Sequence, residues 1–171
     1  MKTMKQLKTI SLVIALVFGA FTMTNAQEVA HIDAQALIQG MPEMKAAKAE
    51  LEKVAKTYEA EIQSLATELQ NKMKLYNEQA ATVSQEENEK RVKEVQGMET
   101  SIRQYQANAQ QELQKKEQDL YIPIMDKARK AIQKVAKAQG YKYVLDSTTG
   151  SGVLLADGKD LLADVKKELG I

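Results

Sequence analysis

Few residues in this chain have side chains that commonly carry out covalent or metal chemistry. The sequence of 171 residues contains one histidine, His31, and no cysteine. A nucleophilic triad or a histidine-based metal cluster needs several such groups, so neither can be assembled within one chain. We therefore interpret His31 as a packed or hydrogen-bonded residue of a strand rather than as a catalytic base.

Carboxylates are abundant, but their spacing favours solubility over catalysis. Glu52 and Lys56 are four residues apart, and so are Glu68 and Lys72, which is the spacing of ion pairs on one face of a helix. The glycines of residues 150–152 lie between predicted strands and open no helix, so they lack the context of a phosphate-binding loop. The sequence predicts no enzyme, no metal site and no cofactor.

The first 26 residues have the pattern of a secretory signal peptide. Lys2, Lys5 and Lys8 precede an uncharged apolar run over residues 10–21, and small residues lead to a cleavage point near Ala26. An apolar run of about 12 residues falls short of the ~20 that span a bilayer. We expect residues 1–26 to be removed and the mature chain to be exported and soluble.

The charge and composition of that mature chain exclude some partners. Without the three lysines, 21 basic residues face 23 acidic ones, a net charge of about −2. Such a chain has no overall positive field to attract nucleic acid. Because it has no cysteine, its stability must come from packing or from oligomerisation rather than from disulfides.

Residues 42–138 are predicted to form one long antiparallel helical hairpin. Between Pro42 and Pro123 there is no proline, and apolar residues recur about every 3.55 residues, between a coiled-coil seam at about 3.5 and a straight helix at about 3.6. The tip lies at residues 81–85, where Ser84 begins a capping-box pattern. At 1.5 Å per residue, an arm of forty residues is roughly 60 Å long.

A tip at residues 81–85 also predicts the register of the hairpin. Residues whose numbers sum to about 167 should face each other, and apolar residues then meet, as Leu65 with Ile102 and Tyr58 with Ala109. Pro123 predicts either a kink in the second helix or a restart of helix. Beyond it lie five basic residues against Asp126 alone, either a site for an anionic partner or, as we favour, a solvated face.

The two ends of the chain, residues 27–41 and 139–171, are predicted to form a small β-rich body. It should contain strands over residues 28–32, 141–146 and 153–156, and short helices over residues 34–39 and 161–169. A body of about 50 residues with few short strands is marginal alone, so we expect it to associate with other copies. The candidate association residues are Val29, Ile32, Tyr143, Val144, Leu145, Val153, Leu154 and Leu155.

Several segments together resemble the Skp/OmpH family of periplasmic chaperones. They are His31-Ile32-Asp33, the helical hairpin, residues 123–128, residues 140–146 and residues 159–165. The resemblance implies a homotrimer in which small β-rich bodies associate and three hairpins project as tentacles. It also implies that the tentacles enclose unfolded outer-membrane β-barrel proteins without ATP. Basic relatives bind lipopolysaccharide, but the hairpin here is near-neutral, which argues against that contact.

Four side chains of the hairpin are candidates for contact with a nonpolar client: Met73, Tyr76, Met98 and Tyr105. Their spacing on the seam favours packing between the two helices as the default. The alternative function is a non-catalytic coiled-coil spacer or adaptor of the envelope, which would bind one folded partner and no unfolded chains. A cytosolic chaperone of similar shape is disfavoured by the signal peptide.

Overall fold

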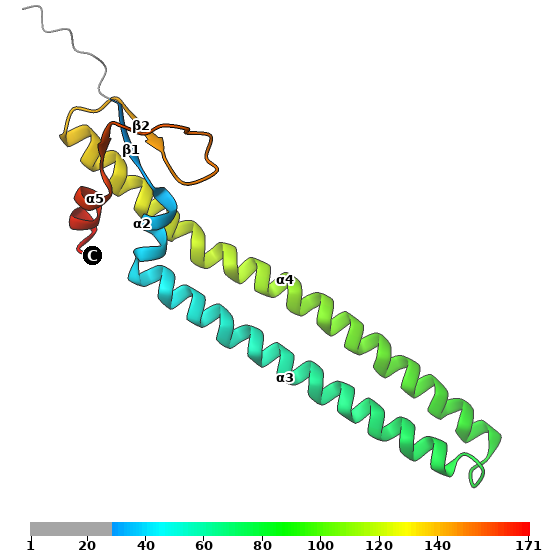
Figure 1. The fold of residues 1–171 in the computed structure, drawn as a ribbon. Coiled ribbons are helices and arrows are strands. Elements are labelled where there is room, and N and C mark those ends of the chain that lie inside the picture. The colour runs from blue at the N-terminus through cyan, green and yellow to red at the C-terminus, as the bar shows by residue number, and fades with distance from the viewer. Residues whose placement is uncertain (1–28) are drawn as a thin grey trace, which may run out of the picture.

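The computed structural model describes residues 29–171, in which two long helices project side by side from a small base (Figure 1). The predicted signal peptide and its cleavage point lie outside these residues. The elements, in chain order, are β1 (Val29–Ile32), α2 (Ala34–Gly40), α3 (Pro42–Gln79), α4 (Gln85–Ala138), β2 (Tyr143–Asp146), β3 (Lys159–Asp160) and α5 (Leu162–Leu169). The predicted class, mostly helical with a small sheet, is confirmed.

Local sequence signals set the ends of the hairpin helices. Pro42 occupies the first turn of α3, where its missing N–H costs nothing. At the tip, the Glu87 N–H donates to the Ser84 hydroxyl at 3.2 Å and so caps α4. The Asn88 side chain donates to the carbonyl of Ala80 at 2.9 Å and ties the end of α3 to the start of α4. The predicted capping signal at Ser84 is confirmed.

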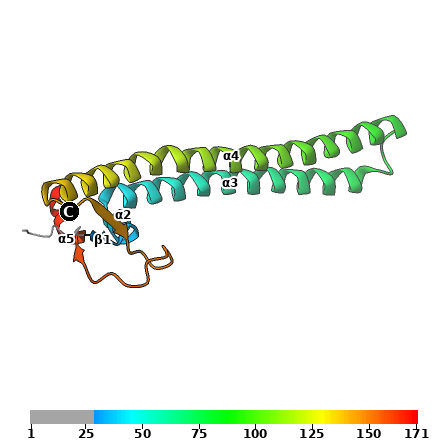
Figure 2. The ribbon, with the colours of Figure 1, turned by 90° about the horizontal axis from the view of Figure 1, so that it is seen from above.

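The predicted register of the hairpin is also confirmed. Side-chain contacts between α3 and α4 join Tyr76 to Arg91, Tyr58 to Tyr105, and Glu50 to Lys116. The numbers in these pairs sum to between 163 and 167, so they follow the predicted register to within about one helical turn. Because α3 and α4 remain in this register from tip to base, the hairpin is one continuous arm (Figure 2).

Helix α4 continues through Pro123 without a break. Of the two outcomes predicted there, a restart of helix is therefore wrong. A proline inside a helix removes one backbone hydrogen bond. The α4 side chains on both sides of Pro123, Ile124 and Leu120, pack on the core of the base, and this packing holds the helix together across the defect.

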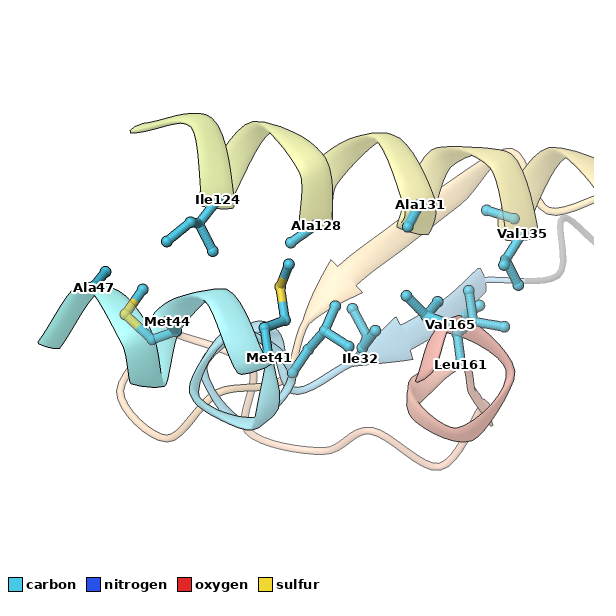
Figure 3. Packing of buried hydrophobic residues seen from close by; sticks show 13 residues of the cluster. Ile32, Met41, Met44, Ala47, Ile124, Ala128, Ala131, Val135, Leu161 and Val165 are labelled. Carbon is cyan, nitrogen blue, oxygen red and sulfur yellow. The ribbon is translucent and has the colours of Figure 1, made fainter. Parts of the chain in front are cut away.

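The core of the molecule lies in the base, where the strands and short helices meet the ends of the arm (Figure 3). The strand β1 contributes Ile32, the last helix and its cap contribute Val165 and Leu161, and α4 contributes small residues that let these side chains approach. The core members on α4 are Ile124, Ala128, Ala131, Val135 and Ala136. Alanines on one face of α4 thus allow a short strand and a short helix to pack closely against it.

The sheet differs from the prediction in its third strand. It has the order β2-β1-β3 and is parallel throughout, with Ala30 paired to Val144 on one side and to Lys159 on the other. The predicted strand over residues 153–156 is wrong. Val153 to Ala156 form no ladder within one chain, whereas the polar pair Lys159–Asp160 reaches β1.

Two glycines are required by the backbone of the base. Gly140 ends α4 with φ of 82°, and the N–H of Tyr141 donates back to the carbonyl of Ala136 at 2.9 Å, as in a Schellman cap. Gly158 lies so close to β1 that a Cβ there would be 2.6 Å from the carbonyl oxygen of Val29. Gly140 thus closes the end of α4, and Gly158 allows the loop to return to the sheet.

Candidate functional site

The arm buries its apolar seam only in part, because two helices cannot enclose a seam from all sides. In α3 the seam residues beyond the base are half-buried, namely Leu51, Val54, Tyr58, Ile62, Leu65 and Leu69. Only Ala109, opposite the large Tyr58 side chain, is fully buried in the outer part of the arm. The arm therefore presents a long, partly apolar flank to its surroundings.

Near the tip, three large apolar side chains are exposed outright. Met73 is 40% exposed, Leu75 is 46% exposed and Val92 is 55% exposed. Leu75 and Val92 lie at the same level of the hairpin, because they are paired in the predicted register. We call these three residues the tip patch, a name for the exposed side chains at this end of the arm; Met73 and Leu75 are two positions apart and project from different sides of α3. Exposed apolar side chains of this size can contact a partner, so the tip patch is a candidate contact surface.

A polar cluster lies beside the tip patch and holds the two helices together. The carboxylate of Glu94 accepts hydrogen bonds from Lys72 and, at 2.6 Å, from the hydroxyl of Tyr76. The Lys72 ammonium, and after it the Tyr76 hydroxyl, lower the pKa of Glu94. Arg91 lies over the Tyr76 ring, 4.6 Å from its centroid. These contacts fix the orientation of Tyr76.

A second cluster lies halfway along the arm. The hydroxyl of Tyr105 on α4 donates to the carboxylate of Glu61 on α3, and this hydrogen bond raises the pKa of Tyr105 to about 12. The ring of Tyr105 meets that of Tyr58 edge to face, with centroids 6.1 Å apart. Tyr105 is therefore a contact between the helices.

The four predicted client-contact residues thus lie in different environments. Met73 is exposed in the tip patch, Met98 is half-buried on the seam, and Tyr76 and Tyr105 are each held by a carboxylate of the opposite arm helix. The sequence pattern did not select Leu75 or Val92. Val92 follows the spacing of the seam and Leu75 lies off it, so their exposure could be found only from the register and the helix faces.

The eight predicted association residues also separate into two groups. Ile32 is buried in the core of its own chain, and Val144 and Val153 are half-buried. Five side chains face solvent: Val29, Tyr143, Leu145, Leu154 and Leu155. Leu154 is fully exposed and Leu155 is 83% exposed, both in the loop between β2 and β3. The base therefore has apolar side chains that one chain does not bury.

Within residues 29–171, no group of three or more His, Asp or Glu side chains could hold a metal ion. His31 lies in β1, and its Nδ1 is 3.0 Å from the hydroxyl of Ser147. This contact ties β1 to the segment after β2. None of the helices over the same residues is long and apolar enough to cross a membrane.

A comparison with known protein families shows which family this chain belongs to. Residues 28–169 match the family described as outer membrane protein (OmpH-like). The chain belongs to the OmpH-like family. The resemblance predicted from its strands, its hairpin and its C-terminal segments is confirmed.

Other members of the OmpH-like family have similar length. A protein of Pectobacterium atrosepticum named chaperone protein Skp is 24% identical over 144 residues, which cover 84% of this chain and 86% of the relative. A chaperone protein Skp of Photorhabdus luminescens is 26% identical over 156 residues, which cover 91% of this chain and 93% of the relative.

The fold is shared with a crystal structure of an outer membrane chaperone (OmpH-like) from Caulobacter crescentus CB15. The two chains superpose with a TM-score of 0.75 at 22% identity, over 83% of each. The arm and base described above are therefore a fold that this distant OmpH-like protein also has.

Proposed function

We propose that this OmpH-like protein is a periplasmic chaperone that binds unfolded outer-membrane β-barrel proteins and prevents their aggregation without ATP or another cofactor. In this proposal residues 1–26 are a signal peptide cleaved near Ala26. Residues 42–138 form a tentacle, and residues 27–41 and 139–171 form an association body. Three copies associate through their bodies, so that three tentacles enclose a cavity for the client. The protein does not act as an enzyme.

The observation that carries the proposal is the half-open apolar seam along an arm of roughly 60 Å, in a chain that matches the OmpH-like family over residues 28–169. Relatives of similar length bear the name chaperone protein Skp. Unfolded chains expose scattered apolar side chains in no fixed pattern. A long surface that offers many weak apolar contacts can hold such chains, because individually weak contacts add up when they are linked.

The charge of the arm supports contact by apolar side chains more than by electrostatic attraction. Residues 42–139 carry 17 basic and 16 acidic side chains. Some of these charges pair across the hairpin: Lys72 with Glu94, Lys116 with Glu50, and Lys127 with Glu43. These paired charges largely neutralise each other within the arm, so they attract a partner only weakly. We therefore do not extend the proposal to lipopolysaccharide or to nucleic acid.

The test is dilution of a urea-unfolded β-barrel protein into buffer with the purified protein, with aggregation followed by light scattering. We expect a several-fold excess of the protein to suppress scattering without nucleotide. A variant with Met73→Gln, Leu75→Gln and Val92→Gln should suppress it less, because the exposed tip patch has become polar. Glutamine preserves helix propensity, so the fold should remain intact.

The matched control is Ile122→Gln, which removes an exposed apolar side chain from the base end of α4. It should suppress aggregation as the unmodified protein does. Unchanged scattering at every ratio of protein to barrel would refute the chaperone function. Tight capture of one folded envelope protein, with no affinity for unfolded chains, would instead favour the spacer or adaptor function.

A further inference from the structure

The sulfur atoms of this chain separate into a shielded group and an accessible group. The sequence has no cysteine, so all of its sulfur is in methionine side chains. Met41 and Met44, at the N-terminal end of α3, are 1% and 6% exposed, whereas Met73 on α3 is 40% exposed and Met125 on α4 is 46% exposed. Met98 is half-buried on the seam. An oxidant in solution should therefore reach some of these sulfur atoms long before others.

The shielded methionines, Met41 and Met44, belong to the core of the base. Figure 3 shows their side chains between the start of α3 and the facing turns of α4. The Met41 N–H donates to the carbonyl of Ile38 at 3.1 Å, so Met41 also joins α2 to α3. Side chains in such a core meet solvent only when the core opens. Oxidation of these two residues should therefore require local unfolding of the base.

Met73 differs because its side chain is accessible in the folded arm and belongs to the tip patch. The other two members, Leu75 and Val92, have hydrocarbon side chains, which peroxide does not oxidise. Oxidation of methionine to its sulfoxide turns a flexible apolar side chain into a polar one. The tip patch therefore has one member whose polarity a covalent reaction can change, at a position outside the buried core.

Met125 is about as exposed as Met73 but lies at the other end of the arm. It lines a groove of the base between α2 and α4. At 1.5 Å per residue, it is about 50 Å along α4 from Val92 in the tip patch. Oxidation of Met125 therefore leaves the tip patch unchanged. The two methionines are similar in exposure and different in location, so one is a control for the other.

We propose that Met73 is an oxidation-sensitive site through which hydrogen peroxide weakens the binding of clients to the arm, while the base keeps its fold. The Met73 sulfur attacks one oxygen of hydrogen peroxide, and the O–O bond breaks as the S–O bond forms. The other oxygen leaves as water with both protons, so the sulfur is oxidised by two electrons and the peroxide is reduced. The inference rests on the proposed function, because it assigns a control of client binding to the tip patch.

The chemistry of Met73 suits a reversible control in an exported protein. The periplasm is an oxidising compartment, and a chain without cysteine has no thiol that can react with an oxidant there. Methionine sulfoxide reductases return the sulfoxide to the thioether, so the change at Met73 can be reversed without new synthesis. The shielding of Met41 and Met44 keeps the same oxidant from the core of the base.

Peptide mapping by mass spectrometry tests the site. The purified protein is treated with hydrogen peroxide, and the sulfoxide at each methionine is followed over time. We expect Met73 and Met125 to react first, Met98 more slowly, and Met41 and Met44 at least about tenfold more slowly than Met73. In urea all five should react at similar rates, which is the control for protection by the fold. Equal rates in the folded protein would overturn the assignment of Met73.

Suppression of aggregation tests the consequence. Peroxide-treated protein should suppress the aggregation of an unfolded barrel protein as weakly as Met73→Gln does, and treatment with methionine sulfoxide reductases should restore suppression. Met73→Leu keeps a similar apolar volume without sulfur, so its suppression should resist peroxide. Met125→Leu is the matched control, and its suppression should stay as sensitive to peroxide as that of the unmodified protein.

The outcomes separate this inference from the proposed function. If the untreated protein suppresses aggregation but Met73→Leu loses suppression in peroxide as the unmodified protein does, the inference is overturned and the chaperone function remains. A lower mass of the assembly after peroxide treatment, measured by light scattering, would place the effect in the base and would also overturn it. Failure of the untreated protein to suppress aggregation would count against the chaperone function, whereas the order of oxidation would still test the accessibility of Met73.

Discussion

Two tyrosine hydroxyls on the arm each donate a hydrogen bond to one glutamate of the opposite helix. Tyr105 and Tyr76 lie on the seam, where each ring packs between the helices and each hydroxyl reaches a glutamate. A seam made only of aliphatic side chains would leave the relative shift of two such long helices weakly defined. Hydrogen bonds at fixed positions along the arm favour one register, since each is lost when the helices slide.

The titration of Tyr105 is the first prediction. Its hydrogen bond to Glu61 raises the pKa of Tyr105 from 10.0 to about 12. A raised pKa means that this contact stabilises the folded state below about pH 10 and is lost as the pH rises toward 12. The phenolate absorbance, compared with that of Tyr105→Phe, should show one tyrosine titrating near pH 12. In Glu61→Gln that pKa should fall toward 10, and an ordinary pKa in both proteins would contradict the assignment.

Two glycines should respond to alanine with opposite signs. In Gly158→Ala the new Cβ meets the Val29 carbonyl oxygen at 2.6 Å, so one backbone must move and stability should fall by about 1–3 kcal/mol. In Gly97→Ala the Cβ meets nothing within 4 Å inside a helix, so stability should rise by about 1 kcal/mol. Urea unfolding measures both. Equal effects of the two substitutions would show that the close approach at Gly158 is absent.

At the scale of elements, the packing of a large side chain against a small one sets the spacing of α3 and α4. Ala109 is buried opposite Tyr58, whereas Ala107 on the next face of α4 is exposed. Ala109→Leu should therefore overpack the seam and lower stability by about 1–3 kcal/mol. Ala107→Leu adds the same atoms in solvent and should change stability by less than about 0.5 kcal/mol. Thermal unfolding of both variants measures this, and a neutral Ala109→Leu would mean that the helices pack in another register.

The long elements could be predicted from the sequence because their signals are local and repeated. The seam of the hairpin recurs over many turns, and the caps at Ser84 and Gly140 are single residues with one clear conformational role. The register followed from the position of the tip. The polar contacts of Glu61 with Tyr105 and of Glu50 with Lys116 agree with that register, but the apolar pattern alone does not indicate them.

The third strand could not be predicted in the same way. Residues 153–156 have the apolar composition of a strand, but they find no partner within one chain. Lys159 and Asp160 have no such composition, yet they pair with β1 because the loop returns there through Gly158. Strand pairing depends on which segment lies beside the strand in the folded chain, and the periodicity of the sequence does not show which segment that is. For the same reason the sequence does not indicate the exposure of Leu75 and Val92.

At the scale of the whole molecule, the base contains the buried core, whereas the arm contains the exposed apolar side chains that we propose contact the client. The fully buried large side chains Ile32, Leu37, Met41, Leu161 and Val165 are all in the base, whereas the outer arm has mostly half-buried ones. The arm is therefore the less stable part and should open first. Amide hydrogen exchange should be faster near the tip of α3 and α4 than in β1. Uniform protection along both helices would contradict this division.

We propose that this chain assembles into a trimer that holds one unfolded barrel protein. Light scattering after size-exclusion chromatography measures this most directly, for the protein alone and after mixing with an unfolded barrel. We expect the mass of three chains without the barrel, and the mass of three chains plus one barrel with it. A monomer in the first measurement, or an unchanged mass in the second, would contradict the account.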